Sequence, residues 1–222
     1  SAVTYELRDI IEHQTNPTVA PYVKTGEVTL RVTALCQNQA EGEALAEPMI
    51  RTILERVGDV VYSTTGESLP ETCARLLADD HLTLALAESC TGGLLASELV
   101  AIPGCSKFLL EGCVAYSDDA KMRRLGVKPE TLEQFSAVSE ACAREMAEGV
   151  RAASGASYAL ATTGYAGPDG GTEEDPVGTV YIALASAAGT QVKRIRLFGE
   201  RARIREIACL HAFDLLRRTL CQ

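Results

Sequence analysis

Short apolar runs alternate with helix-like segments over the last two thirds of the sequence. The run at residues 82–87 is almost wholly apolar, as strands covered by helices on both faces are, and residues 157–163 have the pattern of another buried strand. Residues 112–116 also have the pattern of a strand. Helical patterns separate and follow them, at residues 94–100, 118–125, 139–153 and 202–220. This alternation predicts a three-layer α/β/α domain. A hairpin-like turn joins two more strands at 179–186 and 191–198, so we expect a mixed, mostly parallel sheet.

The first 66 residues have the pattern of a separate small α/β module. Two helices and two strands are expected there, at residues 6–14, 39–56, 27–34 and 59–62. Pro48 falls inside the second helical pattern and predicts a kink or a later helix start. The polar turn STTG at 63–66 marks the boundary. A second domain then occupies residues 67–222, and it begins with a capping box formed by Ser68 and Glu71.

Composition excludes several classes of protein. The 222 residues include 21 Lys and Arg against 30 Asp and Glu, a formal net charge of −9, which argues against nucleic acid as a partner. No apolar run approaches the roughly 20 residues of a membrane helix, so we expect no membrane partner. The eight cysteines form no C-x-x-C pair, which makes zinc and dithiol chemistry unattractive and indicates a reducing, cytoplasmic location.

Two glycine-containing loops follow apolar strands and are candidate binding sites. The first, ESCTGG at 88–93, leads into a helix; glycines let the backbone approach a ligand, and helix-start N–H groups favour a phosphate. Its candidate substrate contacts are Ser89, Thr91, Gly92 and Gly93, and the alternative is a plain strand-to-helix turn. The second loop starts at the end of a buried strand, where open α/β sheets place ligands; its candidates are Thr163, Gly164 and Gly167.

Other residues suggest catalysis or anion binding. Ser106, Tyr116 and Lys121 can reach one rim of the sheet, where a buried lysine accepts a serine proton and a tyrosine relays it. The alternative is an N-cap serine, a core-edge tyrosine and an exposed lysine. Cys90 is a further possible nucleophile beside a helix start. Arg201, at the start of the last helix, can hold a phosphate or carboxylate. The acidic residues after 168 lack metal-ligand spacing, so no metal site is expected.

Several motifs together resemble the C-terminal domain of the CinA family (competence/damage-inducible proteins). In order along the chain they are AESCTGG at 87–93, PGCS at 103–106, AYS at 115–117 with Lys121, GYAGPDGG at 164–171 and PVGT at 176–179. Upstream, NPTVAPY at 16–22 and GEVTLR at 26–31 resemble the KH-type middle domain of the same family. The KH-like module lacks a G-x-x-G loop, so RNA binding is not expected.

The resemblance implies a nicotinamide-nucleotide amidase, which converts nicotinamide mononucleotide and water to nicotinic acid mononucleotide and ammonia without a metal or cofactor. It implies Ser106 as nucleophile, with Ser89 as its rival, Lys121 as general base and Tyr116 as proton relay or orienter. Ser89 and Thr163 become substrate or oxyanion contacts, and Arg201 an anion contact.

The resemblance has implications for assembly as well. It implies a homodimer, and a molybdopterin-binding-like N-terminal domain in full-length members that is absent from this sequence. The alternative function is a non-catalytic nucleotide-binding protein or an interaction partner in competence.

Overall fold

The computed structural model describes residues 2–222, which form two compact units, residues 2–65 and Gly66–Gln222. The first unit is a helix-backed hairpin. Its elements are α1 (Ala2–Glu6), α2 (Arg8–His13), β1 (Thr18–Lys24), β2 (Glu27–Thr33), α3 (Gln39–Val57) and the 3₁₀ turn η1 (Gly58–Val60). β1 and β2 pair antiparallel, with Val19 opposite Val32. The core joins Leu7, Val19, Ile53 and Val57 from both helical and strand segments.

Several expectations for this unit are wrong. The helix expected at 6–14 is two short helices, and residues 58–60 form η1 where a strand was expected. The sequence pattern missed β1, because only Val19 of that strand is buried and its exposed residues leave no clean alternation. α3 runs through Pro48 from its N-cap, Asn38, whose side chain accepts the Glu41 N–H. Nineteen helical residues packed on the hairpin outweigh the one backbone hydrogen bond that proline removes.

The second unit alternates strands and helices around a five-stranded sheet. Its elements are α4 (Leu69–Asp79), β3 (Leu84–Glu88), α5 (Leu94–Val100), the 3₁₀ turn η2 (Cys105–Lys107), β4 (Leu109–Val114), α6 (Asp118–Leu125), α7 (Pro129–Phe135), α8 (Glu140–Ser154), β5 (Tyr158–Gly164), β6 (Thr179–Ser186), β7 (Gly189–Arg196) and α9 (Arg201–Leu220). The strand order is β4-β3-β5-β6-β7. β3 pairs parallel with β4 and β5, and β6 runs antiparallel to both β5 and β7. Only β6 is therefore reversed, which confirms the mixed sheet.

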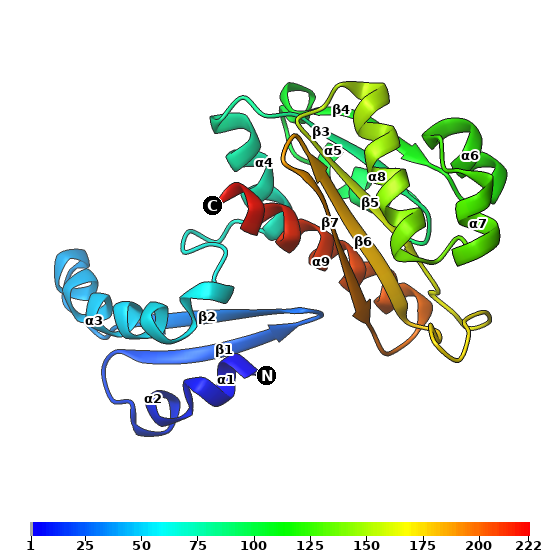
Figure 1. The fold of residues 1–222 in the computed structure, drawn as a ribbon. Helices are drawn as coiled ribbons and strands as arrows, with labels where there is room; N and C mark the ends of the chain where they lie inside the picture. The colour runs from blue at the N-terminus through cyan, green and yellow to red at the C-terminus, as the bar shows by residue number, and fades with distance from the viewer. Residues whose placement is uncertain (1) are drawn as a thin grey trace. The chain divides into compact units, whose positions relative to one another are not determined.

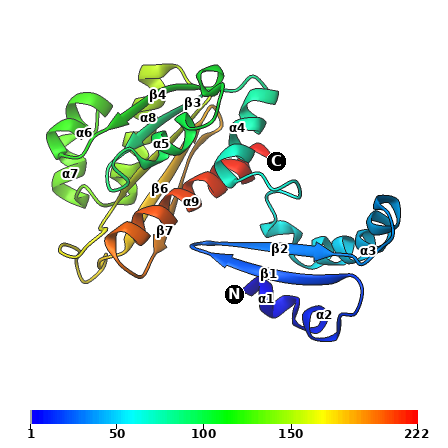
Figure 2. The same ribbon diagram turned by 180° about the vertical axis from the view of Figure 1, so that it is seen from behind.

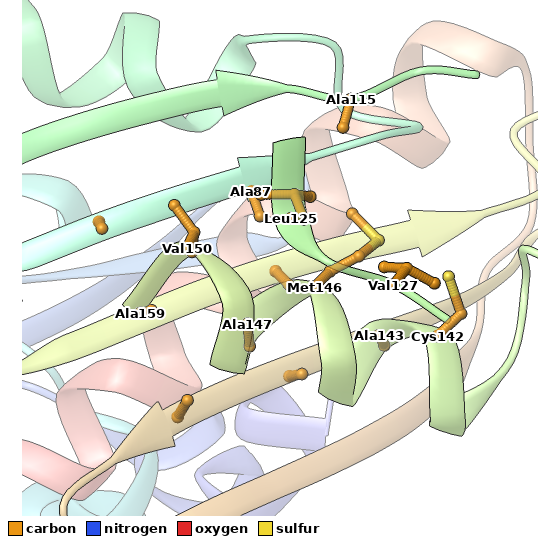
Figure 3. Close-up of a cluster of buried hydrophobic side chains, with 14 of the residues drawn as sticks. Ala87, Ala115, Leu125, Val127, Cys142, Ala143, Met146, Ala147, Val150 and Ala159 are labelled. Atoms are coloured by element: carbon orange, nitrogen blue, oxygen red, sulfur yellow. The ribbon is translucent and has the colours of Figure 1, made fainter. Parts of the chain in front are cut away.

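Helices cover both faces of this sheet, as the three-layer prediction requires. α8 packs on one face, and α9 packs on the other together with α5 (Figures 1 and 2). The α8 side is rich in small residues, because alanines such as Ala87, Ala159 and Ala161 meet Ala143 and Met146 of the helix (Figure 3). Small side chains let the helix lie close to the strands. Within residues 2–222, no helix combines the length and apolarity needed to cross a membrane.

Local signals fix where these elements begin and end. Ser68 and Glu71 form the expected capping box at α4. Gly126 and Gly155 end α6 and α8 with φ angles of 68° and 70°, the left-handed conformation that glycine adopts readily. Because β3, β4 and β5 run in parallel, the loops that follow all three strands gather at one edge of the sheet, and the candidate site lies there.

Candidate functional site

A small cleft lies at the carboxyl ends of β3 and β5. Its volume is about 190 Å³. Its polar and charged lining consists of Ser89, Tyr116, Asp118, Lys121, Thr163, Tyr165 and Arg201. Of the residues singled out in the sequence, Ser89, Tyr116, Lys121, Thr163, Gly164 and Arg201 thus come together. The lining offers a hydroxyl, an amine and a guanidinium side by side, a combination suited to acyl-transfer chemistry on an anionic substrate.

Ser89 is the first residue after β3. Its backbone N–H donates to the Thr162 carbonyl at 2.9 Å, which holds the serine against the end of β5. The residue is only 8% exposed and lines the cleft, and its hydroxyl makes no hydrogen bond to any other of residues 2–222. A buried serine with an uncommitted hydroxyl in a cleft is a candidate nucleophile.

Lys121 supplies an amine from inside the protein. It lies on the buried side of α6 with Leu125, and is only 2% exposed. Its Nζ donates to the Tyr116 carbonyl at 3.0 Å and lies 3.8 Å from Asp118 Oδ1. Removing an ammonium from water costs several kcal/mol, and a single distant carboxylate offsets this only in part. Burial at such a cost indicates a role in the site's chemistry rather than in stability.

Tyr116 and Arg201 form the outer wall of the cleft. Tyr116 is 62% exposed, and its hydroxyl accepts a hydrogen bond from Arg201 Nη2 at 3.1 Å. Arg201 Nη1 donates to the Gly167 carbonyl at 2.8 Å. Gly167 therefore positions the arginine through its backbone instead of lining the cleft. A guanidinium has five N–H donors, so Arg201 retains donors for an anion at the mouth of the cleft.

Thr163 and Gly164 end β5 beside the cleft. The Thr163 hydroxyl donates to the Ala137 carbonyl at 2.7 Å and so ties the strand to the loop before α8. Its oxygen keeps acceptor capacity, and the residue lines the cleft. Gly164 is required by packing, because a Cβ there would lie 2.6 Å from the Thr179 carbonyl oxygen. The glycine thus lets β5 and β6 pair closely at the edge of the site.

The turn after Ser89 does not bind a ligand in the expected way. The buried Glu88 carboxylate accepts the N–H groups of Gly93, Leu95 and Ala96 at 2.9–3.1 Å. The donors expected to hold a phosphate are thus occupied. The Thr91 hydroxyl is buried and forms a hydrogen bond with the Thr162 hydroxyl at 2.7 Å. The proposal of Thr91, Gly92 and Gly93 as substrate contacts is corrected here, since the protein itself uses their polar groups.

Ser106 lies far from the cleft. It belongs to η2, before β4, and the neighbouring Phe108 carbonyl accepts the N–H of Leu84 at the start of β3. Ser89 follows the other end of β3, a strand of five residues with a rise of about 3.3 Å per residue. The two serines are therefore on the order of 15 Å apart. The expected convergence of Ser106 with Tyr116 and Lys121 is wrong within this chain, because Ser106 precedes the strand that Tyr116 follows.

Sequence reasoning missed four residues that shape the site. Asp118 and Tyr165 line the cleft, Glu88 caps α5, and Arg205 of α9 donates to the carbonyls of Cys90 and Thr91. A carboxylate at the end of an apolar strand was a detectable signal for Glu88. Nothing in the local sequence connects Arg205 to a turn more than a hundred residues earlier.

A larger hollow of 980 Å³ lies elsewhere, beside α7 and α8. Its charged residues are largely paired with each other or with close neighbours: Arg144 with Glu140, Lys128 with Glu145, and Arg194 with Asp175. Its serine, Ser139, has a structural role, because its hydroxyl donates to the Ser136 carbonyl and accepts the Cys142 N–H. Within the part of the chain that the structure describes, no group of three or more His, Cys, Asp or Glu side chains is placed to hold a metal ion.

Comparison with known proteins places this architecture in a family. The family model "CinA C-terminal domain" matches residues 66–220, and "Damage-inducible protein CinA KH domain" matches residues 1–63. The chain belongs to the CinA family. A CinA-like protein of Kosmotoga olearia is 48% identical over 218 residues, which are 98% of this chain and 53% of that protein. The chain thus spans about half the length of the curated relatives it matches.

Solved structures of competence/damage-inducible proteins match a large part of this chain. Competence damage-inducible protein A from Klebsiella pneumoniae is 41% identical, with a TM-score of 0.68, and the match covers 69% of this chain and 96% of that one. A competence/damage-inducible protein from Agrobacterium tumefaciens is 40% identical, with a TM-score of 0.65 and coverage of 70% and 98%.

Proposed function

We propose that this CinA-family chain is an amidohydrolase that converts nicotinamide mononucleotide to nicotinic acid mononucleotide and ammonia. One observation carries the proposal: the uncommitted hydroxyl of Ser89 and the buried amine of Lys121 line the same cleft. The motif resemblance supplies the substrate. Arg201 at the mouth of the cleft suits a substrate with one phosphate.

The reaction needs a nucleophile, a base and stabilisation of the developing oxyanion. Ser89 Oγ attacks the amide carbon while Lys121 Nζ takes the hydroxyl proton. That proton then leaves with the amide nitrogen as ammonia, and an ester on Ser89 remains. Water, deprotonated by the same amine, hydrolyses the ester to the free acid. Tyr116, held by Arg201, orients the substrate or relays the proton.

Ser89 replaces Ser106 as the proposed nucleophile because of its position. The test is ammonia release from nicotinamide mononucleotide, measured with a coupled dehydrogenase assay, with free nicotinamide as control substrate. Wild-type protein is expected to release ammonia from the mononucleotide alone, with and without a chelator. Ser89→Ala should lower turnover by at least about 10³-fold while its circular dichroism and melting stay unchanged, because the nucleophile is gone.

Ser106→Ala provides the matched control. It removes the same hydroxyl from an exposed position at the other end of β3 and β4, and should keep turnover within about twofold. Retained turnover in Ser89→Ala would show that the nucleophile is misassigned. Loss of turnover in a folded Ser106→Ala variant would show that the cleft of a single chain is not the complete site. Binding of the mononucleotide without turnover in the wild type would instead favour a nucleotide-binding protein.

A further inference from the structure

The turn that follows Ser89 contains two successive glycines. Gly92 and Gly93 have φ angles of 60° and 92°, in the left-handed region that glycine adopts readily. The same freedom gives such a turn access to many other conformations. The Ser89 hydroxyl makes no hydrogen bond to any other of residues 2–222, so it does not anchor the turn. The place of the nucleophile therefore depends on other groups that hold this backbone.

The N–H groups of the turn are bonded to groups close by in the sequence. Those of Cys90 and Thr91 bond to the Cys90 thiol, and that of Gly92 donates to the Ser89 carbonyl at 3.1 Å. The Glu88 carboxylate, which is 1% exposed, binds three further N–H groups at the start of α5, the farthest of them eight residues along the chain. These bonds shape the turn and join it to the end of β3. They do not join it to the other segments of the site.

Arg205, in the second turn of α9, makes that connection. Its Nε donates to the Cys90 carbonyl at 3.2 Å and its Nη2 to the Thr91 carbonyl at 2.7 Å. The side chain is half-buried, and it forms no ion pair with an acidic side chain among residues 2–222. Its planar fork of N–H donors is thus used on two successive backbone carbonyls instead of a carboxylate. A long-range contact of this kind selects one conformation of a flexible turn.

The same helix also holds the outer wall of the cleft. Arg201 and Arg205 are four residues apart and so lie on one face of α9. Arg201 lines the cleft and donates to the Gly167 carbonyl and the Tyr116 hydroxyl, whereas Arg205 does not line the cleft. One rigid helix therefore fixes both the turn that carries the nucleophile and the proposed anion contact.

We propose that Arg205 is a positioning residue, which holds the two-glycine turn in the conformation that keeps Ser89 in the cleft with Lys121. The inference rests on the proposed amidase function and on Ser89 as nucleophile. Attack on the amide carbon needs the serine oxygen, the base and the substrate in one geometry, and a displacement of about 1 Å can lower the rate about 10²-fold. Arg205 acts on this geometry through the backbone of Cys90 and Thr91, without touching the substrate.

The test compares three variants by steady-state kinetics with nicotinamide mononucleotide. Arg205→Ala removes both contacts to the turn, and Arg205→Lys keeps the charge but lacks the planar fork that binds two carbonyls. Arg203→Ala is the matched control, because it makes the same change at an exposed residue of α9 that does not line the cleft. Arg205→Ala should lose about 10²-fold in kcat with KM within about threefold, because the alignment of the nucleophile is lost while the groups that bind the substrate remain.

The other variants separate positioning from a general loss of structure. Arg205→Lys should recover part of the kcat that Arg205→Ala loses, and Arg203→Ala should keep both kinetic constants. Circular dichroism and melting identify the variants that are folded. An unchanged kcat in a folded Arg205→Ala variant overturns the proposal. A raised KM with unchanged kcat overturns it too, because Arg205 would then bind the substrate in its ground state.

A second measurement reads the reactivity of Ser89 without the substrate. A fluorophosphonate probe forms a P–O bond with an activated serine hydroxyl while fluoride leaves, and mass spectrometry of the peptide covering residues 88–96 gives the rate. Labelling of Ser89 should be at least about tenfold slower in Arg205→Ala, because the serine is displaced from its base, and unchanged in Arg203→Ala. Labelling of Ser89 at the wild-type rate in Arg205→Ala overturns the positioning role whatever the kinetics show.

The two measurements also distinguish failure of this inference from failure of the proposed function. If the wild type releases no ammonia but is labelled at Ser89, the amidase function fails, and slower labelling in Arg205→Ala still supports the positioning role. If the wild type is neither active nor labelled at Ser89, the function and the positioning role fail together. If the wild type is active and only Arg203→Ala is impaired, the function stands and the role of Arg205 is overturned.

Discussion

Lys121 is buried at a cost in stability, and its amine lines the candidate site. Its ammonium is nearly inaccessible to water, yet its neighbours within hydrogen-bonding or ion-pair distance are one carbonyl and one exposed carboxylate 3.8 Å away. An amphipathic surface helix would normally present a lysine to solvent. Here α6 buries Lys121 beside Leu125, and the amine ends at the cleft. The packing of α6 on α8 provides the stability that offsets this burial.

Burial makes the Cys90 thiol, a possible nucleophile beside Ser89, unreactive. Burial is the main cause that raises the pKa of its thiol to about 12, well above the ordinary value near 8.5. The thiol therefore stays protonated at pH 8, and thiolate is the reactive form. We expect iodoacetamide at pH 8 to modify the exposed Cys36 and Cys221 in native protein and to leave Cys90 unmodified. Peptide mass spectrometry after labelling gives the answer for each cysteine.

Denatured protein provides the control for this labelling. In urea all three thiols should react at similar rates, because the burial that raises the pKa of Cys90 is gone. A native protein that carries the label on Cys90 at pH 8 would contradict the burial of this thiol and would return Cys90 to the candidate nucleophiles.

At the scale of the element, the sequence predicted what local patterns determine. The strands β3 and β5 followed from short apolar runs, and α4, α6 and α8 from caps and glycine stops. The 3₁₀ turn at residues 58–60 and the helix α7 were not recognised, because short elements carry too little periodicity to separate them from turns. Tertiary packing decides such segments.

The candidate site was predictable in part for the same reason. Ser89 and Thr163 follow buried strands, and that rule placed both correctly at the cleft. Ser106 does not line the cleft, because it precedes its strand, and the true start of β4 at Leu109 was not visible in the sequence pattern. Arg205 could not be found, since its contact with the turn is made only when α9 packs on the sheet.

The packing of α6 against α8 depends on one glycine. A Cβ at Gly149 would lie 1.7 Å from the Leu125 carbonyl oxygen, so the two helices touch backbone to backbone there. Gly149→Ala should lower the free energy of unfolding by about 1–3 kcal/mol, the usual cost of overpacking, even though alanine favours a helix more than glycine does. Urea denaturation followed by circular dichroism measures the loss.

The exposed neighbour on α8 provides the comparison for Gly149. Glu148→Ala changes an exposed side chain of the same helix, and should alter the free energy of unfolding by less than about 0.5 kcal/mol. If Gly149→Ala were as stable as wild type, the close approach of α8 to the end of α6 would be incorrect, and the placement of Lys121 on α6 would need revision as well.

For the whole molecule, the two units are separate in their cores and in their chemistry. The core of the first unit is drawn from residues before 62, and the alanine-rich core under α8 from residues after 84. Every residue that lines the cleft, and Arg205 and Glu88 behind it, belongs to the second unit.

Separate cores predict that the second unit works alone. A fragment of residues 66–222 should fold, melt in a single transition, and hydrolyse nicotinamide mononucleotide with a kcat within about twofold of the full chain, because its core and cleft are complete. The Klebsiella pneumoniae relative supports this expectation, since 96% of its chain is matched by 69% of this one. Calorimetry and the ammonia assay test the two parts. A folded fragment with kcat reduced more than tenfold would show that residues 1–65 complete the site.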